Sequence, residues 1–157
     1  MALIKSISGI RGTIGGKPGD TLSPLDVVRF TAAYGTWLLS RAGDNKKVVI
    51  GRDGRISGSM VQELVVNTLT GLGIDVVDLG HSTTPTVEVA VKMEKADGGI
   101  ILTASHNPKE WNALKLLNEE GEFISAETGA NVLELAARED FLFAFVDRLG
   151  TVTKDDS

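Results

Sequence analysis

Cysteine is absent from the 157 residues of the chain, which excludes a disulfide framework, a thiolate zinc site and a cysteine nucleophile. Aromatic residues make up only 5% of the sequence, so aliphatic side chains must build the core. The two histidines, His81 and His106, are too few for a histidine-rich metal site. No apolar run approaches the ~20 residues that span a bilayer, and the N-terminus lacks an apolar stretch of signal-peptide length. We therefore expect a cytoplasmic protein without a membrane partner.

Acidic residues outnumber basic ones, 21 to 16, which gives a formal net charge of −5. This balance disfavours nonspecific binding to nucleic acids, which needs a basic face, but it permits a local basic pocket for a phosphorylated metabolite. The 18 glycines show no collagen-like period and indicate tight turns and close backbone approaches. Gly9 and Gly12 beside Arg11 would allow a phosphate to approach the backbone. The length predicts one ordinary domain with a short tail.

Strand-like and helix-like apolar patterns alternate along the chain with short connections. Predicted strands cover residues 3–10, 47–51, 75–79, 98–102 and 113–117, and a glycine-rich turn is expected at 9–16. A serine, or a proline in the first turn, marks each helix start: Ser23-Pro24, Ser57 or Ser59, Pro85, and Ser125. The alternation predicts an α/β fold, a three-layer α/β/α domain with a mostly parallel, mixed sheet. Residues 154–157 are expected to form an exposed tail or linker.

The loop at 103–108 carries the most chemistry in the sequence. It leaves a predicted buried strand and places the hydroxyl of Ser105 beside the imidazole of His106. In parallel sheets, sites gather in loops beyond the carboxyl ends of strands, where the segments 52–55 and 80–84 are also expected. The chain has no P-loop, dinucleotide fingerprint or nucleophile elbow. A serine that receives and donates phosphate needs nearby cations, and the sequence offers Arg11, Arg52, Arg55, His106 and Lys115.

Each of these features also has a plain structural interpretation. Ser105 and His106 are compatible with an ordinary turn, because loops favour serine for its local hydrogen bonds. The charged segment 52–55 is also compatible with an exposed turn that is held by ion pairs. Lys115, inside an apolar run, is able to extend its ammonium group to solvent, and His81 fits a structural role in a turn.

The residues Thr103-Ala104-Ser105-His106-Asn107-Pro108 resemble the phosphoserine loop of the α-D-phosphohexomutases, which include phosphoglucomutase, phosphomannomutase and phosphoglucosamine mutase. The segments 9–12, 51–58 and 112–115 are similar to that family in order and spacing. The resemblance covers nearly the whole chain but only the first of the family's four domains. It implies a phosphoserine domain I at residues 1–150, the start of an interdomain linker at 151–157, and the absence of domains II to IV.

The resemblance also implies a reaction, in which the full enzyme interconverts hexose 1-phosphate and hexose 6-phosphate. Ser105 would carry the phosphoryl group to a phosphorylated hexose, giving a hexose 1,6-bisphosphate that serves as intermediate and activator. His106 and Lys115 are the other implied catalytic residues, and Arg11, Asn107 and Lys115 are the implied substrate contacts. Mg²⁺ is the implied cofactor, a metal bound in part through the phosphate on Ser105, with its other ligands in the missing second domain.

The chain departs from the family pattern in two ways. The family often has glycine where this chain has Ala113, and a need for glycine-like backbone there would alter the placement of Lys115. The family's aspartate-rich metal loop, sugar loop and C-terminal phosphate loop do not occur, so we expect a truncated chain or a fragment, nearly inactive alone.

The arginines of segment 52–55 are expected only to shape the site. The alternatives are a phosphoglucosamine mutase domain, a non-catalytic phosphosugar-binding module, and a hydrolase using Ser105 and His106, which lacks an evident acidic orienter.

Overall fold

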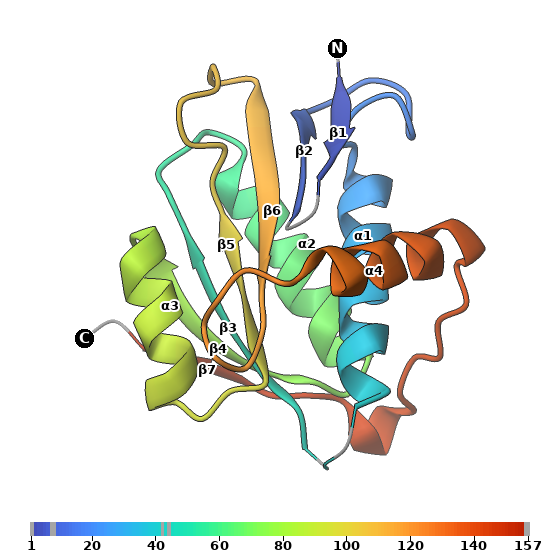
Figure 1. The fold of residues 1–157 in the computed structure, drawn as a ribbon, viewed down its shortest axis with the longest axis vertical. Helices are drawn as coiled ribbons and strands as arrows, with labels where there is room; N and C mark the ends of the chain where they lie inside the picture. Colours follow the sequence, from blue (N-terminus) through green and yellow to red (C-terminus); the bar gives the residue numbers. More distant parts are fainter. Residues whose placement is uncertain (1, 7–8, 42, 44, 156–157) are drawn as a thin grey trace.

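The computed structural model describes residues 2–6, 9–41, 43 and 45–155. These residues form a seven-stranded sheet in the order β1-β2-β6-β5-β3-β4-β7 (Figure 1). The strands are β1 (Leu3–Lys5), β2 (Gly9–Thr13), β3 (Lys47–Arg52), β4 (Asp75–His81), β5 (Gly98–Leu102), β6 (Trp111–Leu117) and β7 (Val152–Lys154). The helices are α1 (Pro24–Leu39), α2 (Gly58–Gly71), α3 (Thr84–Met93) and α4 (Ala126–Arg138), followed by the short 3-10 helix η1 (Val146–Arg148).

The sheet is mixed. Neighbouring strands from β5 through β3 and β4 to β7 run parallel, whereas β1, β2 and β6 are joined to each other and to β5 by antiparallel pairing. Helices lie on both faces (Figure 1), which confirms the predicted three-layer α/β/α fold. The carboxyl ends of β3, β4 and β5 meet at one edge, as the parallel pairing requires.

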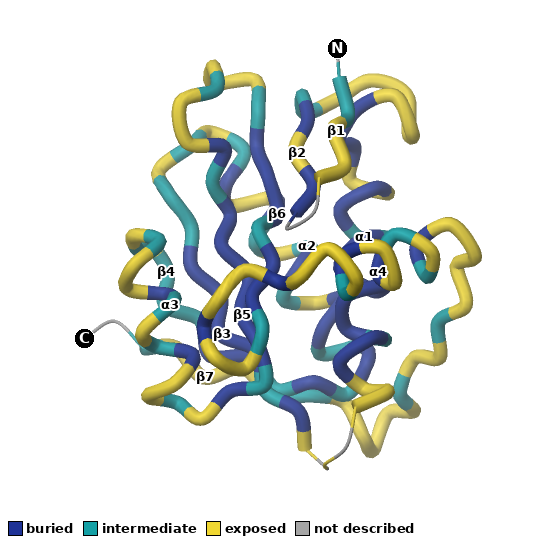
Figure 2. The backbone as a smooth tube through the Cα atoms, viewed as in Figure 1, coloured by how far each residue is buried: buried dark blue, intermediate teal, exposed yellow. Residues whose placement is uncertain are grey.

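Alternating side chains of the central strands supply two cores. Val48 and Ile50 of β3 pack in the larger core with residues of α1, α2 and α4. Val49 between them faces the other way and packs with Val87 and Val91 of α3, as the two-residue period of a strand dictates. Much of α1 is buried, whereas the segment after α4 is largely exposed (Figure 2). Only α3 covers the second face in the described residues, so the end of that face near β2 and β6 stays open.

Side-chain caps begin three of the helices, at Ser23 and Ser125 as the sequence predicts, and at Thr83, two residues before the predicted start at Pro85. Ser23 forms a capping box with Asp26 at the start of α1, and Thr83 and Ser125 accept cap hydrogen bonds at α3 and α4. Ser57 occupies the N-cap position of α2 without such a bond. Its hydroxyl instead accepts a hydrogen bond of 2.9 Å from Asn112, which ties the start of α2 to β6.

The N-terminal segment differs from the single strand predicted over residues 3–10. β1 and β2 form an antiparallel pair in which Leu3 lies opposite Gly12, and residues 7–8 lie outside the described part of the chain. The expected turn at 9–16 is wrong for Gly9–Thr13, which pair with β6 along their length. Local sequence does not reveal a partner about 100 residues away, so the glycines read as a turn.

The predicted linker at residues 151–157 begins with a strand. β7 pairs in parallel with β4, with Val76 opposite Val152 and Asp78 opposite Lys154. The expected tail is therefore wrong for Lys154, which lies in the sheet. The residues of β7 are Val, Thr and Lys, and all three are exposed. This short sequence has no apolar pattern of the kind that marks a buried strand. The domain boundary at residue 150 stays a prediction.

Candidate functional site

The loop at 103–108 opens onto a cleft between the end of β5 and the open end of the sheet. Arg11 of β2 and Lys115 of β6 point toward this face because the residues beside them in sequence, Ile10, Leu114 and Leu116, face the larger core. A cavity of about 260 Å³ results, and it is lined by Arg11, Ala104, Ser105, His106, Asn107, Ala113 and Lys115. The structure thus brings every predicted site residue of the resemblance to one place.

Ser105 and Lys115 are in direct contact. Lys115 Nζ donates a hydrogen bond of 2.8 Å to Ser105 Oγ. The backbone of Ser105 has a φ of 54°, in the left-handed region that residues other than glycine rarely adopt. Such conformations cluster at functional sites, where the surrounding structure holds them. The serine hydroxyl is exposed and lies beside a cation, as a phosphate-carrying group requires.

Arg11 reaches the same loop from β2, the strand paired with β6. Its guanidinium donates a hydrogen bond of 3.3 Å to Asn107 Oδ1. A second cavity of about 170 Å³ adjoins the first and shares Arg11, Ala113 and Lys115 with it. Two cations therefore border both cavities, which suits a ligand that carries dense negative charge.

His106 lies at the cleft, but it does not form the arrangement of a serine hydrolase. Among the hydrogen bonds of the described residues, Ser105 Oγ receives one from Lys115 and none from His106. No ion pair within the described ranges joins His106 to a carboxylate. A nucleophilic serine of that kind needs a histidine base held by an acidic partner, so the geometry gives the hydrolase alternative no support.

The two arginines of segment 52–55 have different places. The guanidinium of Arg55 lies under the 103–108 loop and donates to the carbonyl of Ser105 at 2.8 Å. Arg52 instead bonds to Gln62 of α2 and lies 3.0 Å from His81 Nε2. Arg55 thus contacts the serine loop, whereas Arg52 and His81 do not line the cavity beside Ser105. The expectation that these arginines shape the site stays a prediction.

Thr103 and Asp53 lie in segments that the sequence marked, but neither was named as a site residue. Thr103 donates a hydrogen bond of 2.6 Å to Asp53 Oδ2 and accepts one of 3.1 Å from the amide of Ser105. Asp53 is also paired with Arg55 at 3.2 Å. The contact joins loops about 50 residues apart, and a threonine at the end of a strand carries no local signal of such a partner.

Ala113 has ordinary strand backbone, so the departure from glycine does not displace Lys115. It is buried in β6 opposite Arg11, and it is not among the described residues with positive φ. Gly9 shows where glycine is needed: a Cβ there would collide with the carbonyl oxygen of Leu114. The close approach expected at Gly9 therefore exists, but its partner is a neighbouring strand.

The described residues do not form a complete metal site. They contain no group of three or more His, Cys, Asp or Glu side chains able to hold an ion. The carboxylate of Asp53 is engaged at both oxygens: Oδ2 accepts from Thr103 and from Arg55 Nε, and Oδ1 accepts from the amide of Arg55. A phosphate on Ser105 would be one ligand source, and a magnesium ion would need others from outside these residues.

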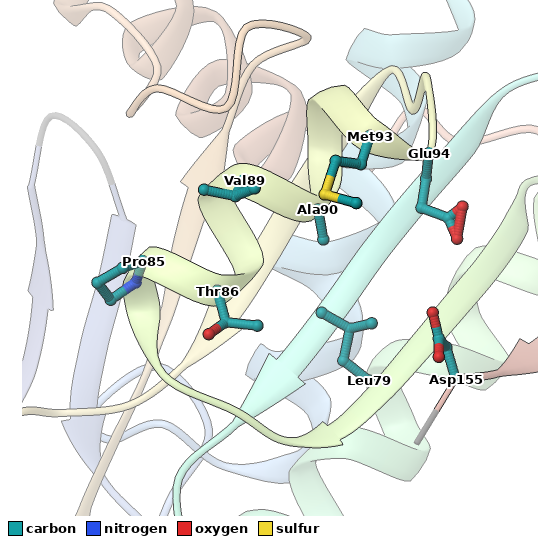
Figure 3. Close-up of a pocket in the computed structure, with 8 residues that line it drawn as sticks. All are labelled: Leu79, Pro85, Thr86, Val89, Ala90, Met93, Glu94 and Asp155. Carbon is teal, nitrogen blue, oxygen red and sulfur yellow. The ribbon is translucent and has the colours of Figure 1, made fainter. Parts of the chain in front are cut away.

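A larger cavity, of about 470 Å³, lies on another part of the molecule. It is bordered by α3, β4 and the residue after β7, and Figure 3 shows Val89 and Met93 above Leu79 with Glu94 and Asp155 at one end. Two carboxylates at its edge disfavour a phosphorylated ligand. Within the described ranges, none of the helices has both the length and the apolar character to cross a bilayer.

Comparison with the sequences of known proteins finds one family model that matches most of the chain. A family model described as "Phosphoglucomutase/phosphomannomutase, alpha/beta/alpha domain I" matches residues 3–143. A phosphoglucomutase/phosphomannomutase of Thermococcus kodakarensis is 37% identical, over 92% of this chain and 32% of the relative. A phosphoglucosamine/phosphogalactosamine mutase of Sulfurisphaera tokodaii is 33% identical, over 90% of this chain and 29% of the relative.

Comparison with solved structures points to the same family as the sequence comparison. A phosphoglucomutase/phosphomannomutase family protein from Burkholderia thailandensis superimposes with a TM-score of 0.83 and 26% identity. The match covers 98% of this chain and 33% of that one. The chain thus spans about a third of the length of the relatives that it matches.

Proposed function

The chain belongs to the phosphoglucomutase/phosphomannomutase family, whose domain I it matches over residues 3–143, and we propose that it supplies the phosphate-carrying serine of a phosphohexomutase. The observation that carries the proposal is the contact of 2.8 Å between Lys115 Nζ and Ser105 Oγ, at a cavity that Arg11 also lines. A phosphoryl group in transfer carries concentrated negative charge, and fixed cations at its position lower the barrier.

The proposed first half-reaction moves the phosphoryl group from Ser105 to the substrate. The bond between phosphorus and Ser105 Oγ breaks as a bond forms to a hydroxyl oxygen of a hexose monophosphate. His106 takes the proton that this hydroxyl loses, and Lys115 gives a proton to the departing serine oxygen. The product is a hexose 1,6-bisphosphate. After it turns around, its other phosphoryl group returns to Ser105, and both proton transfers run in reverse.

The proposed substrates are hexose 1-phosphate and hexose 6-phosphate. Arg11, Lys115 and Asn107 are the residues proposed to contact them, because they line the cavity beside Ser105. An amino sugar is the alternative, since one relative is named a phosphoglucosamine/phosphogalactosamine mutase. Mg²⁺ stays a prediction, as does a cytoplasmic location, and no step above depends on the metal.

The proposal is tested by locating the phosphate. The chain is incubated with glucose 1,6-bisphosphate, and intact-mass and peptide spectra are recorded. We expect one added phosphate at Ser105, and none in Ser105→Ala. A phosphate on a different serine would contradict the assignment, and substantial mutase turnover by the 157-residue chain would contradict its role as one part of an enzyme.

A non-catalytic phosphosugar-binding module is the second candidate. It is favoured by the two cavities that share Arg11 and Lys115, because binding there does not require the serine. This alternative predicts that glucose 6-phosphate binds equally well to Ser105→Ala and more weakly to Arg11→Ala, with no phosphate on Ser105 after exposure to the bisphosphate. Appearance of the phosphoserine decides for the mutase.

A further inference from the structure

Arg55 is a nearly buried cation that the proposed reaction does not use. Its side chain is only 11% exposed. One terminal nitrogen donates to the carbonyls of Ser105 and Asn107, at 2.8 Å and 2.9 Å. The other donates to the carbonyls of Pro108 and Trp111, at 2.7 Å and 3.1 Å. One guanidinium therefore holds the backbone of the serine loop and of the segment that follows it.

The remaining N–H of Arg55 is also engaged. Its Nε donates to Asp53 Oδ2 at 3.2 Å. An arginine side chain has five N–H donors in a rigid planar fork, and here all of them have a partner within the protein. Arg55 consequently has no donor left for a substrate phosphate, which separates its role from that of Arg11.

A second set of bonds holds the other side of the Ser105 peptide. The amide of Ser105 donates to Thr103 Oγ1 at 3.1 Å, and Thr103 donates to Asp53 Oδ2 at 2.6 Å. Asp53 in turn accepts from Arg55. The bonds form a closed ring in which the carbonyl of Ser105 is fixed by Arg55 and its amide by Thr103.

We infer that Arg55 is a positioning residue for phosphoryl transfer, which it serves through the backbone of Ser105 and together with Asp53 and Thr103. This inference rests on the proposed function of Ser105 as phosphate carrier. Ser105 has a φ of 54°, a conformation that a serine leaves when nothing holds it. Loss of the ring would release the loop and move Ser105 Oγ away from Lys115.

Arg52 provides a matched control from the same loop. It carries the same charge three positions earlier, yet its partners are Gln62, His81 and, at 3.4 Å, the main-chain carbonyl of Asp53. Lysine at either position keeps the positive charge but offers three donors on a single nitrogen. Lysine at position 55 is therefore unable to reproduce four carbonyl contacts, whereas lysine at position 52 leaves the serine loop untouched.

The first experiment measures the rate at which glucose 1,6-bisphosphate phosphorylates Ser105, as a function of its concentration. For Arg55→Lys we expect the rate at saturation to fall about 10²-fold, the size of effect that a misplaced reacting group causes. The half-saturating concentration should stay within about twofold, since Arg11 and Lys115 remain. For Arg52→Lys both quantities should match the unaltered chain.

A second pair of variants keeps the test valid if Arg55→Lys folds poorly. Thr103→Val removes the hydroxyl with little change of shape, and Thr103→Ser retains it. We expect Thr103→Val to lower the saturating rate about tenfold or more, because the amide of Ser105 loses its acceptor, and Thr103→Ser to stay near the unaltered rate. Hydrogen exchange of the Ser105 amide should be about tenfold faster in Arg55→Lys and Thr103→Val than in their controls.

The outcomes separate the inference from the proposed function. An unaltered phosphorylation rate in both Arg55→Lys and Thr103→Val would overturn the positioning role. So would an unaltered exchange rate of the Ser105 amide in these two variants. If the unaltered chain takes no phosphate at Ser105, the proposed function fails and the positioning role fails with it. In that case faster exchange in the variants would still establish Arg55 as the group that orders the loop.

Discussion

Lys115 Nζ of β6 and Ser105 Oγ in the loop after β5 lie 2.8 Å apart. β5 and β6 pair with Ile101 opposite Lys115 and Leu102 opposite Leu114, so the serine loop connects two strands that are paired with each other. The loop at 103–108 therefore begins two residues after Ile101, the partner of Lys115. The contact depends on the strand register, because a shift by one residue would turn Lys115 into the core.

Replacement of Lys115 by methionine should slow phosphorylation of Ser105 by glucose 1,6-bisphosphate about 10²-fold. The change removes the cation at Ser105 Oγ and the proposed proton donor, and general acid catalysis is worth at least this factor. Stability should change little, since Lys115 is only half-buried. The rate of phosphate uptake, followed by mass spectrometry, checks the prediction.

The matched control for Lys115 is Lys109→Met, which removes an exposed lysine near the same loop. We expect its rate of phosphate uptake to equal that of the unaltered chain. An equal loss of rate in both variants would point to net charge as the cause, and would contradict a specific role for Lys115.

Replacement of Arg11 by alanine should weaken binding of glucose 6-phosphate by about tenfold or more. A hydrogen bond to a charged group contributes about 1.5–3 kcal/mol, and Arg11 borders both cavities of the cleft. Titration calorimetry measures the dissociation constant. Arg138→Ala removes an exposed arginine of α4 and should leave it unchanged, so comparable weakening in both variants would rule out a specific contact.

The elements that could be predicted from the sequence are those whose signals lie in neighbouring residues. The capping box of Ser23 and Asp26 marks α1, and the apolar run in β5 is buried along its whole length. The six-residue loop after β5 indicated the candidate site for the same reason, since its chemistry is contained in neighbouring residues. Such features depend on short-range hydrogen bonds and side-chain periodicity, which a single sequence displays.

The parts that the sequence did not predict depend on distant partners. The sequence of β2 predicts a glycine-rich turn, but in the structure this segment pairs with β6. The residues of β7 are all exposed and form no apolar face. Arg52 and Arg55 look equivalent in a charged loop, and the bonds to α2 and to the serine loop distinguish them. Pairing and side-chain direction of this kind follow from tertiary packing, which local propensity does not encode.

Ser105 holds a left-handed backbone conformation, and this predicts a stability difference between two of its variants. Ser105→Gly should be more stable than Ser105→Ala by about 1 kcal/mol, because glycine adopts a positive φ without the steric cost that a Cβ brings. Both variants lack the hydroxyl, so the comparison isolates the backbone. Urea denaturation measures the two free energies of unfolding. Equal or reversed values would show that the φ of 54° at this residue carries no strain.

Tyr34 is the single tyrosine of the chain, and it links α1 to the two central strands. Its hydroxyl donates to the carbonyl of Leu117 at 2.5 Å and accepts from the amide of Gly99 at 3.1 Å. Gly98 leaves room for it, since a Cβ there would overlap the hydroxyl. Burial raises the pKa of this phenol well above its ordinary value of 10.0, because the phenolate would lose its hydration.

The raised pKa of Tyr34 predicts that stability falls at alkaline pH. Below pH about 10 the phenol is neutral in both the folded and the unfolded chain, so its full contribution is present. Above that pH the unfolded chain loses the proton while the folded chain keeps it, which favours unfolding by up to about 1.4 kcal/mol per pH unit. Urea denaturation across this range should show the decline, and Tyr34→Phe should lack this part of it. The absorbance of tyrosinate provides a direct check: it should appear only as the protein unfolds, and its appearance in the folded chain near pH 10 would contradict the prediction.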